Sequence, residues 1–165
     1  METSGYVLNE RLKRIEPNSK KCSFCYDGTT ESINDCYFVP VFKENDRTNI
    51  VVYRSVKYSK IDIGIPRCTN CKAIHQASKK RAAVLSSLGA LVVIAFTIYN
   101  FLDIHPIVSV LLLFLSAFIG FGGYAFLQNT FTRKAGINTL KEGAENDAMV
   151  QDFLIKGWSL TQPSA

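Results

Sequence analysis

Residues 66–81 read PRCTNCKAIHQASKKR and lead directly into the apolar stretch 82–102, which reads AAVLSSLGALVVIAFTIYNFL. The first stretch holds a Cys-x-x-Cys pair, a histidine and three successive basic residues. The second contains no Asp, Glu, Lys or Arg, and it has the about 20 residues that a helix needs to cross a hydrocarbon core about 30 Å thick. A motif typical of metal ligands therefore stands directly before a predicted membrane span.

A second apolar stretch, residues 107–128, is also long enough to span a membrane and free of charged side chains. A cleaved signal peptide would lie at the N-terminus, which excludes one for a stretch that begins at residue 82. A soluble helical hairpin would carry a polar stripe at the helical period. The polar residues of the first stretch do not line up as one; they are Ser86, Ser87, Thr97 and Asn100. We therefore predict two membrane-spanning helices.

Basic residues flank both predicted spans. Lys79, Lys80 and Arg81 precede the first span, and Arg133 and Lys134 follow the second, whereas the connection between the spans has neither Lys nor Arg. Because Lys and Arg are retained on the cytoplasmic side of short flanking segments, we predict a two-pass protein of the inner (plasma) membrane with both termini in the cytoplasm. We interpret the formal net charge of +5 in the same way, because basic residues at membrane borders are attracted to anionic lipid head groups.

The cysteines form two Cys-x-x-Cys pairs and one single residue. In a reducing cytoplasm such pairs persist as thiols, which favours metal binding over disulfides. Four thiolates close a tetrahedral structural zinc site and leave no open position for catalysis. A redox role is disfavoured because neither pair lies in a thioredoxin-like strand and helix context. The predicted zinc ligands are Cys22, Cys25, Cys68 and Cys71.

Two further residues lie near these pairs in sequence. His75 follows Cys71 by four residues, so it falls on the same face if a helix begins at the second pair. We expect His75 to be a neighbour of the ligands or a surface residue, with replacement of one cysteine as the alternative. Cys36 stands alone at the start of an apolar strand and is expected to be a small buried residue.

The segment between the two cysteine pairs predicts a small antiparallel sheet. Apolar and β-branched residues alternate or cluster along three short runs, which cover residues 37–41, 50–56 and 61–65. Turns are expected at Asn45-Asp46 and at the polar residues 57–60. Pro40 lacks a backbone donor, so its strand is expected at an edge of the sheet.

These features resemble zinc ribbons and treble-clef knuckles. The resemblance is carried by Cys-Ser-Phe-Cys at 22–25, by the small sheet, and by Ile-Pro-Arg-Cys-Thr-Asn-Cys at 65–71. It covers about Lys21 to His75 and implies a metal site without naming a function. The chain also resembles small bacterial proteins that join such a ribbon to a membrane hairpin, some of which are encoded close to defence systems.

The predicted fold is of the α+β class, with a small cytoplasmic zinc-ribbon sheet, a two-helix transmembrane hairpin and a short C-terminal helix. Its parts are a basic polar arm (1–20), the ribbon domain (21–78), the hairpin (79–132) and a C-terminal part (133–165). The last part begins with a small, polar linker at 135–146 and continues as a helix at 147–156 with one apolar face, followed by a tryptophan. This face can dock on the ribbon, lie at the membrane interface or bind another protein.

No catalytic constellation is recognisable, so we do not expect an enzyme. The expected function is that of a membrane-anchored accessory or adaptor protein that contacts lipid and engages a cytoplasmic protein or a nucleic-acid-associated complex. Candidate partner-binding residues are Arg67, Lys72, Phe153, Leu154 and Trp158.

Two alternatives come from other classes of function. An oligomeric membrane-perturbing or channel-like effector is suggested by the small residues Ser116, Gly120 and Gly123, which favour either packing within the hairpin or a homodimer. The lack of charged residues in the spans disfavours it. Direct nucleic-acid binding by the ribbon would rely on phosphate contacts from Arg47, Arg54, Lys57, Lys60, Arg67 and Lys72.

Overall fold

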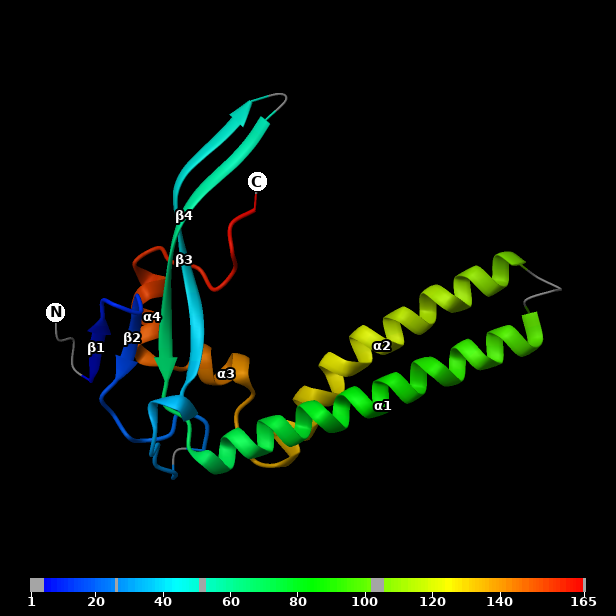
Figure 1. The fold of residues 1–165 in the computed structure, drawn as a ribbon, viewed down its shortest axis with the longest axis horizontal. Helices are drawn as coiled ribbons and strands as arrows, with labels where there is room; N and C mark the ends of the chain where they lie inside the picture. The colour runs from blue at the N-terminus through cyan, green and yellow to red at the C-terminus, as the bar shows by residue number, and fades with distance from the viewer. Residues whose placement is uncertain (1–4, 26, 51–52, 102–105, 165) are drawn as a thin grey trace. The chain divides into compact units, whose positions relative to one another are not determined.

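The computed structural model describes residues 5–25, 27–50, 53–101 and 106–164, which fold as two compact units (Figure 1). One unit contains Met1–Lys72 and Asn138–Ala165, and the other contains Ala73–Ile137. The first unit is therefore built from both ends of the chain, and the apolar hairpin is an insertion between its two parts. The α+β class, the small sheet, the two long apolar helices and the short C-terminal helix are confirmed.

The first unit is centred on a four-stranded sheet (Figure 1). Its strands are β1 (Tyr6–Asn9), β2 (Arg14–Pro17), β3 (Tyr37–Ile50) and β4 (Tyr53–Ile65), in the order β1-β2-β4-β3. The pairs β1/β2 and β3/β4 are antiparallel, whereas β2 runs parallel to β4. The edge position that Pro40 predicted for its strand is confirmed, because β3 ends the order.

The N-terminal segment differs from the predicted polar arm, because it forms β1 and β2. Ile15 of β2 is buried and lies in register with Ile63 of β4, so the pair of strands β1 and β2 contributes to the core of the first unit. Asn9 accepts a hydrogen bond from the backbone N–H of Leu12 at 3.2 Å in the turn, where Lys13 adopts a φ of 48°. Strands of four residues carry too little alternation to stand out among basic residues.

Residues 53–56 of the predicted second strand and all of the predicted third strand lie in the single strand β4, whereas Ile50 ends β3. The predicted turns were wrong, because residues 45–46 and 57–60 lie inside β3 and β4. A register shift between Glu44 and Asp46 leaves Asn45 out of the backbone pairing, as in a β-bulge, and Asp46 then lies opposite Lys57. A bulge is built from the same kinds of polar residue as a turn, which explains why residues 45–46 were predicted as a turn. Residues 51 and 52 lie outside the described part.

The core of this unit lies on one face of the sheet. Val39 and Val41 of β3 and Ile63 and Ile65 of β4 are at most 7% exposed, and cross-strand pairing places them on a common face. The helix α4 (Ala148–Ile155) adds the buried Met149 and Val150. Burial of such side chains supplies most of the stability of a small unit.

The predicted linker at 135–146 was wrong in its second half, where α3 (Leu140–Glu145) begins behind a capping box. The hydroxyl of Thr139 accepts from the N–H of Glu142, and the Glu142 carboxylate accepts from the N–H of Thr139. The predicted C-terminal helix is confirmed as α4, and Asp147 caps it through the N–H groups of Met149 and Val150.

The segment after α4 lies along the sheet. Phe42 and Ser159 exchange backbone hydrogen bonds of 2.8 and 2.7 Å, and the Gln162 amide donates to the hydroxyl of Tyr58 at 2.8 Å. Trp158 packs edge-to-face on Phe153, with 5.2 Å between ring centroids. Of the three expected places for the C-terminal segment, docking on the sheet is the one observed.

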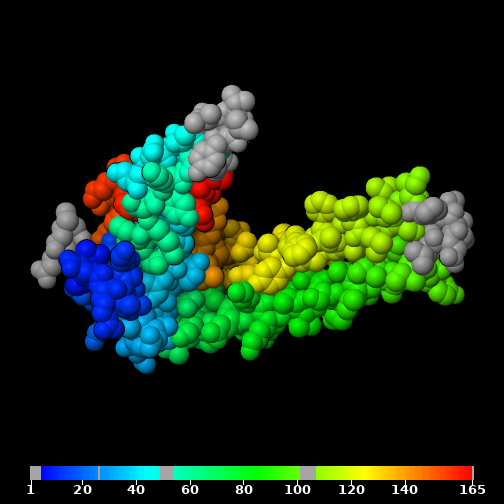
Figure 2. Space-filling view, turned by 45° about the horizontal axis from the view of Figure 1, so that its top comes forward, coloured from blue at the N-terminus to red at the C-terminus, as the bar shows by residue number. Residues whose placement is uncertain are grey.

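The second unit is a helical hairpin, made of α1 (Thr69–Phe101) from Ala73 onward and of α2 (Pro106–Lys134), and the two helices lie side by side (Figure 2). The helix α1 runs without interruption from Thr69 through the basic triplet 79–81 into the apolar stretch, and α2 begins at Pro106. Both helices are long and apolar enough to span a membrane. The connection 102–105, including His105, lies outside the described residues.

The hairpin buries small and hydroxyl-bearing residues and exposes large apolar ones. Ser86, Thr97 and Ser116 are at most 6% exposed, whereas Tyr99 is 89% and Phe121 is 83% exposed. Ser86 and Thr97 are eleven residues apart and share a buried helix face, whereas Ser87 and Asn100 are exposed, so two of the four polar residues line up. Because the hydroxyls bond carbonyls of their own helices and the outer surface is apolar, the arrangement suits lipid better than water.

Close contacts between the helices involve small residues on both sides. A Cβ atom at Gly120 would lie 3.8 Å from the Ala90 Cβ, and one at Gly123 would lie 3.8 Å from the Ser86 Cβ. The small-residue face of α2 therefore packs within the hairpin, which is one of its two expected roles.

Candidate metal centre

The structure brings the two cysteine pairs together. The sulfur atoms of Cys22, Cys25, Cys68 and Cys71 all lie within 4.8 Å of one another. Cys22, Cys68 and Cys71 are buried, and Cys25 is half-buried. Four soft donors gathered around one point form a group that can hold a metal ion.

The first pair lies on a tight turn between β2 and β3. The N–H of Cys22 donates to the carbonyl of Gly28 at 2.8 Å, which closes the turn. Gly28 also donates its N–H to the Cys25 sulfur at 3.3 Å, and Phe24 donates to the Cys22 sulfur at 3.4 Å. A Cβ at Gly28 would lie 2.8 Å from the Cys68 sulfur. Only glycine therefore leaves room for the second pair.

The second pair follows β4 and begins α1. Cys71 in the first turn donates its N–H to the Cys68 sulfur at 3.4 Å, and Cys68 donates to the Cys22 sulfur at 3.3 Å. N–H groups at a helix N-terminus stabilise negative charge on a sulfur, which offsets part of the cost of burying a thiolate there. Backbone donors thus connect the two pairs and orient their sulfurs.

Without a metal, the pKa values of Cys25 and Cys71 are shifted in opposite directions. Burial raises the pKa of Cys25, but N–H groups of Gly28 and Asp27 and the neighbouring thiols outweigh it and lower this pKa to about 7. Burial, followed by interactions with neighbouring thiols, raises the pKa of Cys71 far above its usual range. Four ionised sulfurs at this separation require a compensating cation, and a metal ion binds by displacing their protons.

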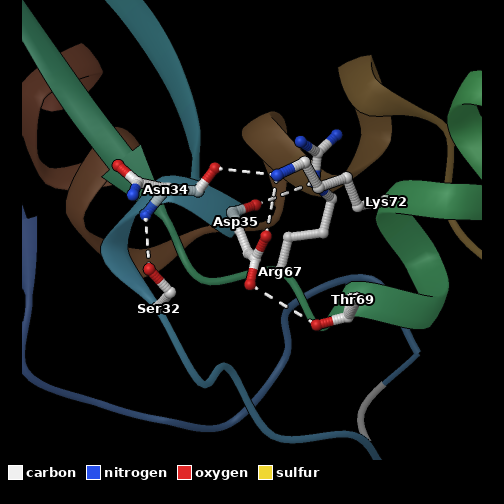
Figure 3. Close-up of polar contacts among 6 residues, drawn as sticks. All are labelled: Ser32, Asn34, Asp35, Arg67, Thr69 and Lys72. Carbon is white, nitrogen blue, oxygen red and sulfur yellow. Dashed lines mark hydrogen bonds and ion pairs between the residues drawn. The ribbon is translucent and has the colours of Figure 1, made fainter.

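A polar network braces the second pair against η1 (Ile33–Asp35), the short 3-10 helix before β3 (Figure 3). The Lys72 ammonium donates to the Asp35 carboxylate at 2.7 Å and to the Asn34 carbonyl at 3.1 Å. Thr69 donates to the same carboxylate at 3.4 Å, and Arg67 donates to the Asp35 carbonyl at 3.0 Å. Arg67 and Lys72, expected to bind a partner, are thus engaged within the chain.

The remaining candidate residues lie outside the cluster. Cys36 is buried, as expected, and is not among the clustered cysteines. His75 is buried one helical turn after Cys71, and within the described residues it does not belong to the cluster. Phe153 and Trp158 are half-buried against each other, and the neighbouring Leu154 is also half-buried.

Sequence reasoning missed two residues that position the site. Phe24, between the first two cysteines, is 1% exposed, and its carbonyl accepts from the N–H of Asn138 at 3.1 Å. A Cβ at Gly143 of α3 would lie 2.7 Å from Phe24 Cδ1 and 2.9 Å from its Cζ. The segment after the hairpin therefore packs directly on the first cysteine turn. The Thr-x-x-Glu capping box at 139–142 was the available indication.

Comparisons with known protein families, curated proteins and solved structures find no match to this chain. The resemblance to zinc ribbons therefore rests on the cysteine pairs and the small sheet alone.

Proposed function

We propose that the four cysteines hold one structural zinc ion. In a tetrahedral thiolate site with Zn–S bonds of about 2.3 Å, neighbouring sulfurs are about 3.8 Å apart. The sulfurs of Cys25 and Cys68 are separated by 3.8 Å. Four thiolates complete the coordination sphere of the ion, so the site serves to stabilise the fold and offers no open position for catalysis.

This metal-binding unit is anchored in a membrane by the hairpin, with both flanks of the hairpin in the cytoplasm. Support comes from contacts between residues that precede and follow the hairpin in sequence. The Tyr6 hydroxyl donates to the Asp147 carboxylate at 2.7 Å, and Phe42 pairs with Ser159. A unit assembled from both flanks has to lie on one side of the bilayer, so the chain crosses twice. The basic residues at 79–81 and 133–134 assign that side to the cytoplasm.

The surface that engages a partner is the outer half of the β3–β4 hairpin, residues 43–50 and 53–60, which we call the β arm (Figure 1). At 43–48 and 54–60 its side chains are exposed or half-buried, and none is buried. A two-stranded ribbon without a packed face is at best marginally stable in water. Both of its edges can accept an added strand. Such an arm gains stability from a partner, which makes the protein an adaptor.

The charge of the β arm indicates the chemistry of that partner. The arm has five basic and two acidic residues. Arg47 is bonded to Glu44, whereas Lys43, Arg54 and Lys57 have no salt-bridge partner among the described residues. The arm therefore favours a cytoplasmic protein with an acidic face. A nucleic acid is the second candidate, because the same three side chains could contact phosphates.

Site-specific photocrosslinking in membranes tests this function. A photoreactive residue at Lys57 in the arm is expected to give a discrete protein adduct, which the double substitution K43E/R54E abolishes. The same residue at Lys141 in α3, whose side chain is 82% exposed, is the control and should give none. Equal adducts from both positions would refute the adaptor function. An adduct lost on nuclease treatment, with affinity that falls steeply with salt, would identify nucleic acid as the partner.

A further inference from the structure

An apolar groove runs along one side of the helical hairpin. Its volume is about 750 Å³, and its floor is made of the small residues Ser86 and Ala90 of α1 and Ser116 and Gly120 of α2. The two serine hydroxyls donate to carbonyls of their own helices, at 3.2 and 2.6 Å. These floor residues therefore present no free donor. The remaining lining is apolar apart from Ser87 and Tyr124, so the groove suits a mainly apolar occupant.

The length of the groove matches one leaflet of a bilayer. On α1 its lining extends from Ala83 to Ile94, which at 1.5 Å per residue is about 16 Å. Half of a hydrocarbon core is about 15 Å. The groove starts two residues after the basic triplet 79–81. It therefore reaches from the head-group level to about the middle of the bilayer.

Two of the three basic residues lie on the groove side of α1. Lys79 precedes Ala90 by eleven residues, which is about three full turns, and Lys80 precedes the groove residue Ser87 by seven, which is about two. Arg81 precedes Ala90 by nine residues, about two and a half turns, so it points to the opposite side. Lys79 and Lys80 are exposed. Positive charge is therefore concentrated at the mouth of the groove.

We infer that the groove binds one anionic phospholipid, with an acyl chain along its floor and the phosphate near Lys79 and Lys80. The inference rests on the proposed membrane location. The acyl chain supplies the apolar occupant that fits the groove, and the head group supplies the negative charge that the two ammonium groups attract. The lipid fills the open side of a helix pair whose floor is built of small residues.

Native mass spectrometry of the full chain tests the inference, using phosphatidylglycerol and phosphatidylcholine with identical acyl chains. One phosphatidylglycerol should remain bound per chain. The double substitution K79Q/K80Q should reduce its preference over phosphatidylcholine by about twenty-five-fold, because each basic residue contributes about fivefold. The charge-matched double substitution R81Q/R133Q should retain the preference. Equal behaviour of the two double variants would overturn the inference.

A second pair of variants tests the groove itself. Ala117 lines the groove and Ala125 of α2 does not, and both are exposed. A117L should fill the groove and abolish retention of both lipids, whereas A125L should leave retention unchanged. If A117L instead dissociates a dimer and leaves lipid retention unchanged, the groove binds a second copy and the inference is wrong. A chain that stays in solution without detergent would refute the membrane location, whereas membrane partitioning without lipid preference would refute only the lipid site.

Discussion

Replacement of Gly143 by alanine sets two opposing effects against each other. Alanine is favoured over glycine inside a helix by about 1 kcal/mol. At position 143, however, the added methyl would lie 2.7 Å from Phe24 Cδ1 and 2.9 Å from Cζ, and closer still to Cε1. Phe24 is 1% exposed and stands between two clustered cysteines. The ring therefore has little freedom to move away.

Overpacking of a filled core costs about 1–3 kcal/mol, and contacts this short place G143A near the upper end. After subtraction of the helix gain, we expect a net destabilisation of about 2 kcal/mol. For a unit of about 100 residues, this lowers Tm by about 8–16 °C. Displacement of Phe24 also moves the cysteine turn, so the variant should lose zinc to a chelator faster than the unmodified chain.

Thermal unfolding of the zinc-loaded chain in detergent measures this effect. G122A is the matched control, because nothing lies within 4 Å of a Cβ at that helical glycine, and it should not lower Tm. In F24L/G143A the smaller side chain makes room for the methyl group, so the double variant should be more stable than the sum of the single effects by at least about 1 kcal/mol. A rise in Tm for G143A, or strict additivity, would show that the Phe24 ring yields and that the reasoning is wrong.

Four further outcomes are expected. Substitution of any one of the four clustered cysteines by serine should abolish bound zinc in elemental analysis, whereas C36S should retain it. Y6F removes the hydroxyl that donates to Asp147, a residue that is only 6% exposed. Urea denaturation should show a loss of about 1–3 kcal/mol in the free energy of unfolding. An unchanged midpoint would mean that water replaces the hydroxyl. A hydrogen bond from the Lys72 ammonium holds the pKa of Asp35 below its usual range. The ionised Asp35 therefore stabilises the fold above roughly pH 4, and this stabilisation is lost on further acidification. D35N should remove this part of the acid dependence of the urea midpoint and leave the rest unchanged. Deletion of residues 138–165 should abolish cooperative unfolding of the remaining metal unit, and tight zinc binding by the truncated chain would contradict this.

The helical hairpin and the cysteine cluster were predictable because each depends on a local pattern. About 20 apolar residues specify a span whatever their detailed contacts, and a two-residue spacer lets both sulfurs of a pair face one ion. The cap of α4 was equally local, since Asp147 precedes an apolar run. Such features need no knowledge of the remaining chain.

The missed features depend on distant residues. The strand β2 is stable because Ile15 meets Ile63 across a parallel pairing, and no local pattern encodes that partner. Asn45 reads as a turn residue, yet the register of β3 against β4 makes it a bulge. Gly143 looks like a weak point in a linker until the Phe24 ring occupies the space that a side chain would need. In each case the tertiary contact, rather than the local propensity, decides the structure.

The order of elements along the chain bears on how the proposed metal centre is stabilised. All four clustered cysteines precede the first apolar stretch of the hairpin in sequence. Yet the turn that holds two of them packs on α3, and the core face of the sheet gains Met149 and Val150 from α4. Each such buried side chain contributes about 1.5–3 kcal/mol, against a total stability of about 5–15 kcal/mol for a whole domain. The unit that holds the cysteines therefore contains residues from both sides of the hairpin, and we expect it to reach its full stability only when residues 138–165 are present.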